Sequence, residues 1–507
     1  MLTVLATAAA AFVVVLWAIP ATWLLPIALA VTALVPVGRL PLPEFVTVLS
    51  PGALVVLVWA LRREHQAKRR PPAVVTVVCA AVAVLLVVGT LTSMSTQRSF
   101  GWGATFVLLV LVPAVGYRLP SAEAARLLDT WVWLAAGLAV FGMIERLLGA
   151  NPVYGGVFAG GDFPIVQYWS DYRVTTTLGH PLHNALFFAA GTVIAVGRFV
   201  ERGRTSTLLA AALGLVGVFL TISRGGIVAV AVGVAIVAIG PVLRSASAVR
   251  ASRANARGLL ALAAVGAGLA AVATSPVFQE RLQSSNGIAS ARARDELGPL
   301  VWSVSEQLGH LGSGPGTSNA LLEARGTPTV IENSWFQLLL SLGLPGALLV
   351  AVLVAAAAWT ALRTGSLSAA AGLAAISTSA AGFNWIESNR PGMLFLGLLV
   401  AAALSASERD TGSSETGGLS RATATPPFPR QTPGTLSAGI AAGSDASRNS
   451  VSRSGSPGSS IAEAARRNAN SARSTPRFGL CDHGTGPAPR QPAFRSASSP
   501  RWYPTRA

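Results

Sequence analysis

Two arginines interrupt long apolar stretches of the sequence and are the first candidates for chemistry. Arg173 lies in the segment 172–184, where Pro181 predicts a turn into a helix that Asn184 can cap. An arginine beside a helix N-terminus attracts anions, because the guanidinium group and the free backbone N–H groups both favour phosphate. The alternative is an interfacial ion pair between Arg173 and Asp171, and position alone leaves both interpretations open.

Arg224 is the second of these arginines, and it lies in the short segment 221–226 between two apolar runs. A charge in so tight a turn must sit at or just within a membrane surface, where it costs less than the ~2.5–3.5 kcal/mol of a central position. Ser223 precedes it, and Gly225 and Gly226 permit backbone conformations barred to other residues and close approach by a ligand. The simpler alternative is an ordinary arginine that reaches out to water.

A carboxylate occurs where a third polar segment meets an apolar run. The segment begins with the Gly/Pro-rich stretch 312–316, which predicts a loop lying close to another part of the protein, and it ends with Glu332 and Asn333. A carboxylate in a setting of low polarity is a stronger base and can accept a proton from a hydroxyl group. The simpler alternative makes Glu332 and Asn333 helix-start residues, which the helix dipole favours.

Other polar residues are weaker candidates. Glu387, Asn389 and Arg390 form a short turn that either completes the same site or is solvated, and we expect solvation. His180 and His183 have the i, i+3 spacing of a metal pair, but no carboxylate nearby has clear ligand spacing, so no metal site is predicted. The sequence has no P-loop, no GxGxxG after a strand, no HExxH and no paired CxxC, which argues against the enzyme classes that these motifs mark.

Taken in order, these segments resemble the O-antigen ligase and O-antigen polymerase superfamily of integral-membrane glycan transferases. Members of that family carry an Arg-x-x-Gly-type segment with a Pro-Asn pair before a helix, and then a Ser-Arg-Gly turn between two spans. A large outer loop follows, which ends in His-Asn or Glu/Asp-Asn before a Leu-rich helix and Gly-x-Pro-Gly. The matching segments here are 173–184, 223–225 and 332–346, within a similarity that covers about residues 120–400.

The resemblance implies that a polyprenyl-diphosphate-linked glycan donor is used at the outer face of the bacterial cytoplasmic membrane, in cell-surface polysaccharide synthesis. Its oligosaccharide would be transferred to, or polymerised on, a glycan or other hydroxyl acceptor, without a metal or cofactor. Arg173 and Arg224 would hold the diphosphate, and Glu332 would act as general base or orient the acceptor. The implied substrate-binding residues are His180, Asn184, Ser223, Gly225, Asn333 and Arg390.

Two departures from the family pattern bear on this assignment. The ligase branch has His at the position of Glu332, which favours a polymerase-like member, and the Pro-Asn pair is interrupted by Leu182 and His183. The main alternative is a multi-span transporter or flippase for an envelope precursor, which predicts internal repeats and interrupted helices with polar residues near the midplane. The ionisable groups stand at the outer ends of the predicted helices, which favours an enzyme. A membrane scaffold acting through its tail is a further alternative.

The elements that must position these residues are membrane-spanning helices. Hydrophobic residues make up 52% of the chain and charged residues 12%, and the charges occur in short clusters between apolar runs. We therefore predict an all-α, polytopic transmembrane helix bundle over residues 1–405, with long extracytoplasmic loops at 150–182 and 275–335. About twelve spans are expected, or thirteen if the chain does not bend within the membrane at Pro20. The apolar runs are 2–19, 21–37, 46–61, 73–92, 102–116, 128–149, 183–199, 206–221, 225–243, 258–274, 336–361, 368–385 and 391–405.

Charge placement predicts the orientation of the bundle. The net charge of +17 comes from arginines at helix ends and in residues 406–507, which is typical of a membrane protein and argues against a nucleic-acid partner. Basic clusters at 62–70, 198–204 and 244–257 are predicted to be cytoplasmic, which puts the three predicted catalytic residues on the opposite face. Residues 406–507 are rich in Gly, Ser, Pro and Arg and predict a disordered cytoplasmic tail, whose arginines either contact anionic membrane lipid or are solvated.

Overall fold

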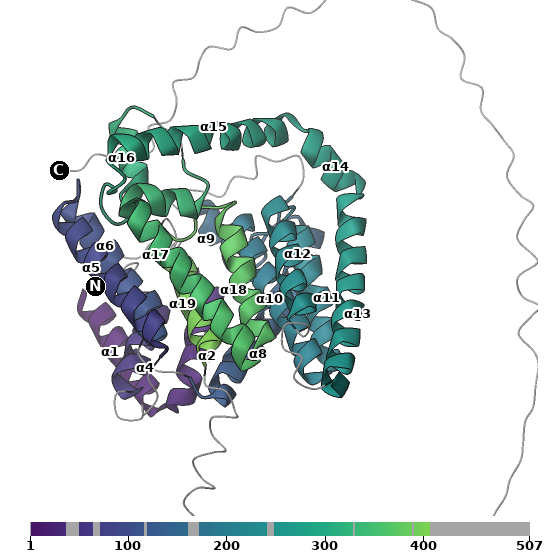
Figure 1. Ribbon diagram of the computed structural model, residues 1–507. Helices are drawn as coiled ribbons and strands as arrows, with labels where there is room; N and C mark the ends of the chain where they lie inside the picture. Colours follow the sequence, from purple (N-terminus) through teal and green to yellow (C-terminus); the bar gives the residue numbers. More distant parts are fainter. Residues whose placement is uncertain are drawn as a thin grey trace, which may run out of the picture. The chain divides into compact units, whose positions relative to one another are not determined.

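Helices form all the regular structure of the described residues, and no strand occurs among them, which confirms the all-α class (Figure 1). The computed structural model describes residues 2–36, 50–63, 71–115, 119–160, 172–240, 248–327, 330–387 and 390–405, so the predicted tail lies outside the described residues. The first helices are α1 (Leu2–Ala18), α2 (Ala21–Leu34), α4 (Pro51–Arg63), α5 (Ala73–Leu91), α6 (Thr96–Phe106), the π-helix η2 (Val107–Leu111), α7 (Val112–Val115), α8 (Ser121–Leu148) and α9 (Gly155–Gly160). The others are α10 (Pro181–Arg202), α11 (Thr205–Leu220), α12 (Arg224–Ile239), α13 (Ala248–Ala273), α14 (Pro276–Gln283), α15 (Ser285–Gln307), α16 (Ser318–Ala324), α17 (Ser334–Thr364), α18 (Leu367–Ala380) and α19 (Arg390–Ala403).

Each predicted apolar run coincides with a helix, and within the described residues six helical stretches are long and apolar enough to cross a membrane. They are α5, the continuous stretch α6–η2–α7, α8, α10, the part of α13 from Ala256 to Ala273, and α17. Six shorter apolar helices accompany them: α2, α4, α11, α12, α18 and α19. Several helices could therefore cross a membrane, as in a multi-pass membrane protein, while the count of twelve or thirteen spans stays a prediction.

Helix α10 forms the centre of the bundle. It is buried along almost its whole length and packs against α8, α11, α12 and α18. Trp131 of α8, Phe187 of α10 and Phe395 of α19 pack together with ring centroids 5.2 to 5.3 Å apart. Because these large side chains interlock, the turn that precedes α10 is attached to a rigid centre.

The predicted outer loop 275–335 is largely helical. Helix α13 leads into α14, and α15 then crosses the ends of the bundle helices at the top of Figure 1 before the chain reaches α16. Residues from this region and from α17 form a second apolar cluster, which comprises Leu297, Val301, Val304, Leu321, Leu322, Ile331, Leu339 and Leu340. This cluster holds α15 against α17, so that one side of α15 faces the bundle.

Helix α17 is interrupted at Gly343, and the Gly/Pro-rich loop before α16 fills the interruption. Gly343 has a φ of 73°, and a Cβ atom there would collide with the carbonyl oxygen of His310. The backbone N–H of Leu344 donates to that oxygen (2.9 Å), while Ser313 N–H donates to the carbonyl oxygen of Leu340 (2.9 Å). The predicted loop lying close to another part of the protein is therefore confirmed.

Candidate functional site

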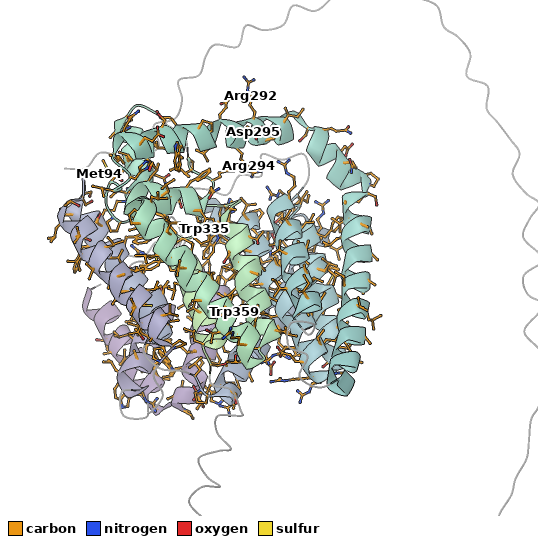
Figure 2. The ribbon with its side chains drawn as sticks, viewed as in Figure 1. Met94, Arg292, Arg294, Asp295, Trp335 and Trp359 are labelled. Carbon is orange, nitrogen blue, oxygen red and sulfur yellow. The ribbon has the colours of Figure 1, made fainter. Side chains whose placement is uncertain are left out.

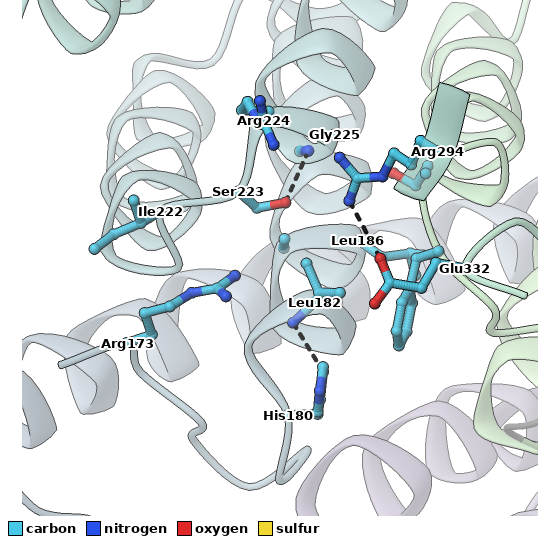
Figure 3. Close-up of a pocket in the computed structure, with 15 residues that line it drawn as sticks. Arg173, His180, Leu182, Leu186, Ile222, Ser223, Arg224, Gly225, Arg294 and Glu332 are labelled. Atoms are coloured by element: carbon cyan, nitrogen blue, oxygen red, sulfur yellow. Dashed lines mark hydrogen bonds and ion pairs between the residues drawn. The ribbon is translucent and has the colours of Figure 1, made fainter. Parts of the chain in front are cut away.

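One pocket in the described part of the structure brings together residues that are far apart in the sequence. It has a volume of about 370 Å³ and lies between the N-terminal ends of α10 and α12, the segment before α17, and α15 (Figure 3). The predicted catalytic residues Arg173, Arg224 and Glu332 all line it. The other lining residues are His180, Leu182, Ala185, Leu186, Ile222, Ser223, Gly225, Gly226, Arg294, Ser379, Gly382 and Phe383.

Arg173 is fixed against the turn that connects α11 to α12. Its side chain is buried, and its Nε donates a 2.7 Å hydrogen bond to the carbonyl oxygen of Thr221. The next residue is attached to the same place, since Val174 N–H donates to the carbonyl oxygen of Leu220 (3.3 Å). The guanidinium group extends into the pocket (Figure 3). Asp171, the alternative partner of Arg173, lies outside the described residues.

The turn before α12 presents a helix N-terminus to the pocket. Ser223 caps α12, because its Oγ accepts a 3.2 Å hydrogen bond from Gly226 N–H, and Arg224 is the first residue of the helix. The strained residue is Ile222, whose φ of 50° is unusual for a β-branched side chain. A strained backbone conformation persists only where surrounding contacts hold it. The contacts around Ile222 therefore fix the direction in which α12 begins.

Gly225 and Gly226 act through their size and not through their backbone freedom. Both are helical residues of α12, so the predicted use of conformations barred to other residues is wrong. A Cβ atom on Gly226 would lie 3.2 Å from Ala185, which shows that α12 packs closely on α10 there. A Cβ atom on Gly225 would have only Ser223 Oγ within 4 Å, at 3.9 Å, so glycine at this position keeps the pocket open.

The N-terminus of α10 also faces the pocket. His180 is its N-cap residue, and its Nδ1 accepts a 3.2 Å hydrogen bond from Leu182 N–H. The imidazole of His180 stacks on Phe383 with ring centroids 5.4 Å apart, and His183 packs on the same ring at 4.9 Å. The two histidines thus form an aromatic cluster. No group of three or more metal-ligating side chains occurs in the part of the chain that the structure describes.

Glu332 pairs with an arginine that the sequence patterns did not single out. Arg294 Nη2 of α15 lies 3.4 Å from Glu332 Oε2. The Arg294 side chain is 38% exposed and the Glu332 side chain 46%, so the predicted setting of low polarity for this carboxylate is wrong. Figure 2 shows Arg294 pointing from α15 toward the bundle, whereas Arg292 points away from it. Glu332 is therefore a partly hydrated carboxylate beside a guanidinium group.

Three predicted substrate-binding residues lie outside the pocket lining. Asn333 caps α17, since its Oδ1 accepts hydrogen bonds from the backbone N–H groups of residues 335 and 336 (2.9 and 3.2 Å), which is the simpler alternative for this residue. Asn184 is fully buried, and its Nδ2 donates to the carbonyl oxygens of Thr175 and His180. Arg390 is the first residue of α19. Their predicted contacts with substrate stay predictions.

Glu387 is buried, so the predicted solvation of this residue is wrong. Its Oε1 accepts hydrogen bonds from the backbone N–H (2.8 Å) and the Oγ (2.7 Å) of Ser318. Burial raises the pKa of the Glu387 carboxyl to about 7, against the opposing effects of the Ser318 hydrogen bonds and the charge of Arg98. Asn389, in the same turn, lies outside the described residues.

The arrangement suits an anionic ligand. Three guanidinium groups (Arg173, Arg224 and Arg294) face one carboxylate, and the N-terminal ends of α10 and α12 add partial positive charge. A planar guanidinium group can donate two parallel hydrogen bonds to the oxygens of a phosphate group. Backbone N–H groups at the start of a helix also donate hydrogen bonds to phosphate oxygens. The sequence matches no protein-family model and no curated protein.

Proposed function

We propose that the chain is an integral-membrane glycan transferase of the O-antigen ligase or polymerase type. Its donor is a polyprenyl-diphosphate-linked oligosaccharide, and its acceptor is a glycan or other hydroxyl compound, in cell-surface polysaccharide synthesis. The observation that carries the proposal is the pocket in which Arg173, Arg224, Arg294 and Glu332 meet from four separate segments of the chain. A cofactor or a metal has no step in the reaction that follows.

The reaction is a displacement at the anomeric carbon of the donor sugar. The acceptor oxygen forms a bond to that carbon, and the bond from the carbon to the diphosphate oxygen breaks with its electron pair going to the diphosphate. Arg173 and Arg224 bind the diphosphate and stabilise the negative charge that grows on it as polyprenyl diphosphate leaves. Glu332 accepts the proton of the acceptor hydroxyl, and Arg294 orients its carboxylate.

Charges at the far end of α10 support an outward-facing pocket. Arg198 Nε and Arg202 Nη1 lie 3.0 and 2.9 Å from the carboxylate oxygens of Asp129, near the C-terminal end of α10, whereas His180 caps the end that faces the pocket. Arginines are enriched at the cytoplasmic ends of spans, which favours an extracytoplasmic pocket. The proposed location is a bacterial cytoplasmic membrane. A polymerase-like activity suits the Glu332 carboxylate better than a ligase activity.

One observation favours the alternative of a transporter or flippase. Helix α17 is interrupted at Gly343, and interrupted helices are typical of transporters. The interruption lies near the start of α17, which begins at Ser334. Backbone N–H groups of the preceding loop donate hydrogen bonds to the carbonyl groups that the interruption leaves without a helical partner. This break therefore anchors the outer loop, which fits an enzyme better than a transport path.

A reconstitution experiment separates the two functions. The purified full-length chain is placed in vesicles that contain an oligosaccharide on polyprenyl diphosphate, and the lengths of the saccharides and the free polyprenyl diphosphate are measured. A transferase lengthens the saccharides, or moves them to an added hydroxyl acceptor, and releases polyprenyl diphosphate. Movement of intact donor across the bilayer without a change in saccharide length would overturn the proposal in favour of transport.

A further inference from the structure

Glu145 is a fully buried carboxylate to which the proposed reaction assigns no role. It lies near the C-terminal end of α8, and five hydrogen bonds converge on its two oxygens. Oε1 accepts from Tyr172 Oη (2.8 Å), Thr175 N–H (2.7 Å) and Thr175 Oγ1 (2.9 Å). Oε2 accepts from Thr176 N–H (2.8 Å) and Asn151 Nδ2 (3.1 Å). Burial and the Glu145 carboxylate raise the pKa of the Tyr172 phenol well above its ordinary value, so this hydroxyl remains a donor.

The geometry requires a carboxylate at this position. The successive backbone N–H groups of Thr175 and Thr176 form a concave anion-binding turn, and each donates to a different oxygen of Glu145. A glutamine amide has one acceptor oxygen and one donor nitrogen, so in either orientation its NH₂ group would face a backbone N–H. Many uncharged side chains could fill the space at position 145, whereas only a group with two acceptor oxygens can accept hydrogen bonds from both backbone N–H groups.

The contacts of Glu145 hold a strained segment. Thr176 has a φ of 38°, a conformation that is strained for a β-branched residue. Its N–H donates to Glu145 and its Oγ1 to Asn184 Oδ1, so both groups are used to keep that conformation. Arg146, next to Glu145, donates from Nη1 to the carbonyl oxygen of Tyr172 (2.7 Å). The segment 172–176 is thus fixed to the end of α8 on both sides of Arg173.

Arg173 is the link from this segment to the pocket. The backbone on either side of it is attached to Glu145 and Arg146, while its own Nε is bonded to the carbonyl oxygen of Thr221. A release of the segment would leave Arg173 free to turn away from the start of α12. We propose that Glu145 is a positioning residue for anion binding, which acts by holding Arg173 in the pocket. The proposal rests on the anion-binding role of the pocket in the proposed function.

Binding of inorganic pyrophosphate to the full-length protein in detergent tests this role, with calorimetry measuring the Kd and thermal unfolding measuring stability. Glu145→Gln is expected to weaken pyrophosphate binding roughly tenfold, the effect of losing a hydrogen bond to a charged group. Arg173→Ala is expected to weaken it at least as much. The double variant Glu145→Gln with Arg173→Ala is expected to bind no more weakly than Arg173→Ala alone, because Glu145 acts through that arginine.

Glu201→Gln is the matched control for a structural carboxylate. Glu201 Oε1 accepts from Ser368 N–H (2.8 Å) and Oγ (3.0 Å) at the C-terminal end of α10, away from the pocket. Its substitution is expected to lower the unfolding temperature and to leave the pyrophosphate Kd unchanged. Two milder variants, Tyr172→Phe and Thr175→Val, keep the carboxylate and its backbone donors, and they are expected to weaken pyrophosphate binding by a smaller factor. They replace Glu145→Gln in the test if that variant does not fold.

The outcomes separate this inference from the proposed function. An unchanged Kd in Glu145→Gln, or in both milder variants where that protein does not fold, overturns the positioning role and leaves the anion pocket intact. Losses that add in full in the double variant also overturn it, since Glu145 would then act independently of Arg173. Absence of pyrophosphate binding by the unchanged protein contradicts the anion pocket itself, and with it both proposals.

Discussion

Arg294 Nη2 and Glu332 Oε2 lie 3.4 Å apart although 38 positions separate the two residues in the sequence. The contact joins α15, in the outer helical layer, to the segment that leads into α17. It places Glu332, the only acidic residue among the described residues that line the pocket, beside a guanidinium group and within the same cavity as Arg173 and Arg224. The proposed proton acceptor is therefore adjacent to a group that can bind an anion, an arrangement that the proposed transfer from a diphosphate donor requires.

Removal of either Arg173 or Arg224 from the pocket is expected to abolish most transfer. Arg173→Ala and Arg224→Ala should each lower the rate by about 100-fold or more, because each removes a positive charge from the site of growing negative charge. The release of polyprenyl diphosphate in vesicles measures this rate. Arg202→Ala is the control: it removes an arginine from the far end of α10, and its rate should stay near normal. Equal losses in all three variants would contradict a specific role of the pocket.

Glu332→Gln separates catalysis from binding. The variant is expected to lose turnover by about 100-fold, as befits a general base, with little change in the Kd for pyrophosphate. The fold should tolerate it, because an ion pair so exposed contributes at most ~1 kcal/mol to stability. Arg294→Gln, in contrast, should lower turnover and also weaken pyrophosphate binding. Unchanged turnover in Glu332→Gln would reduce this residue to part of a surface ion pair.

Glu387 makes stability depend on pH. Its pKa is about 7 in the folded protein and near 4.5 when exposed, so between these values the folded protein keeps a proton that the unfolded chain releases. Stability should therefore fall as the pH rises from about 4.5 to about 7. Unfolding temperatures at pH 5 and pH 8 measure the effect, which should be smaller in Glu387→Gln than in the unchanged protein. An equal pH dependence in both proteins would exclude Glu387 as its source.

Gly343→Ala tests the interruption of α17. Alanine is strained at a φ of 73°, and its Cβ would meet the carbonyl oxygen of His310, so a loss of more than ~1 kcal/mol is expected. Gly137→Ala in α8 is the control, because a Cβ there has no atom within 4 Å and alanine is the better helix former by about 1 kcal/mol. Thermal unfolding of both variants checks the contrast. A Gly343→Ala protein as stable as the Gly137→Ala protein would show that α17 can straighten.

The sequence predicted the bundle helices because long apolar runs are the strongest pattern that a chain can carry. Helices α14, α15 and α16 have no such pattern, since charged and small residues are mixed along them. Arg292 and Arg294 show the consequence for the site. They are two residues apart on α15, yet Arg292 is exposed and pairs with Glu296, whereas Arg294 faces the pocket. Only the packing of α15 on α17 distinguishes them.

Local patterns identified Arg173, Arg224 and Glu332, because charges that interrupt apolar sequence are rare. They gave no information about partners from distant segments. The position of Glu387 in a short turn predicts solvation, but Ser318, 69 positions away, donates a hydrogen bond to its carboxylate in the fold. Glu145 carries no signal in the sequence, because it stands at the end of an apolar run, where an acidic residue is ordinary. Its five donors come together only in the fold.

Photocrosslinking tests the central claim that this pocket binds a lipid-linked diphosphate. The full-length protein in vesicles is irradiated with a photoreactive polyprenyl diphosphate analogue, and mass spectrometry locates the labelled peptides. We expect labels in the peptides that contain Arg173, Arg224 or Glu332; excess polyprenyl diphosphate should suppress these labels, and they should be weaker in Arg224→Ala. Labels that are confined to other helices, or that polyprenyl diphosphate does not displace, would contradict it.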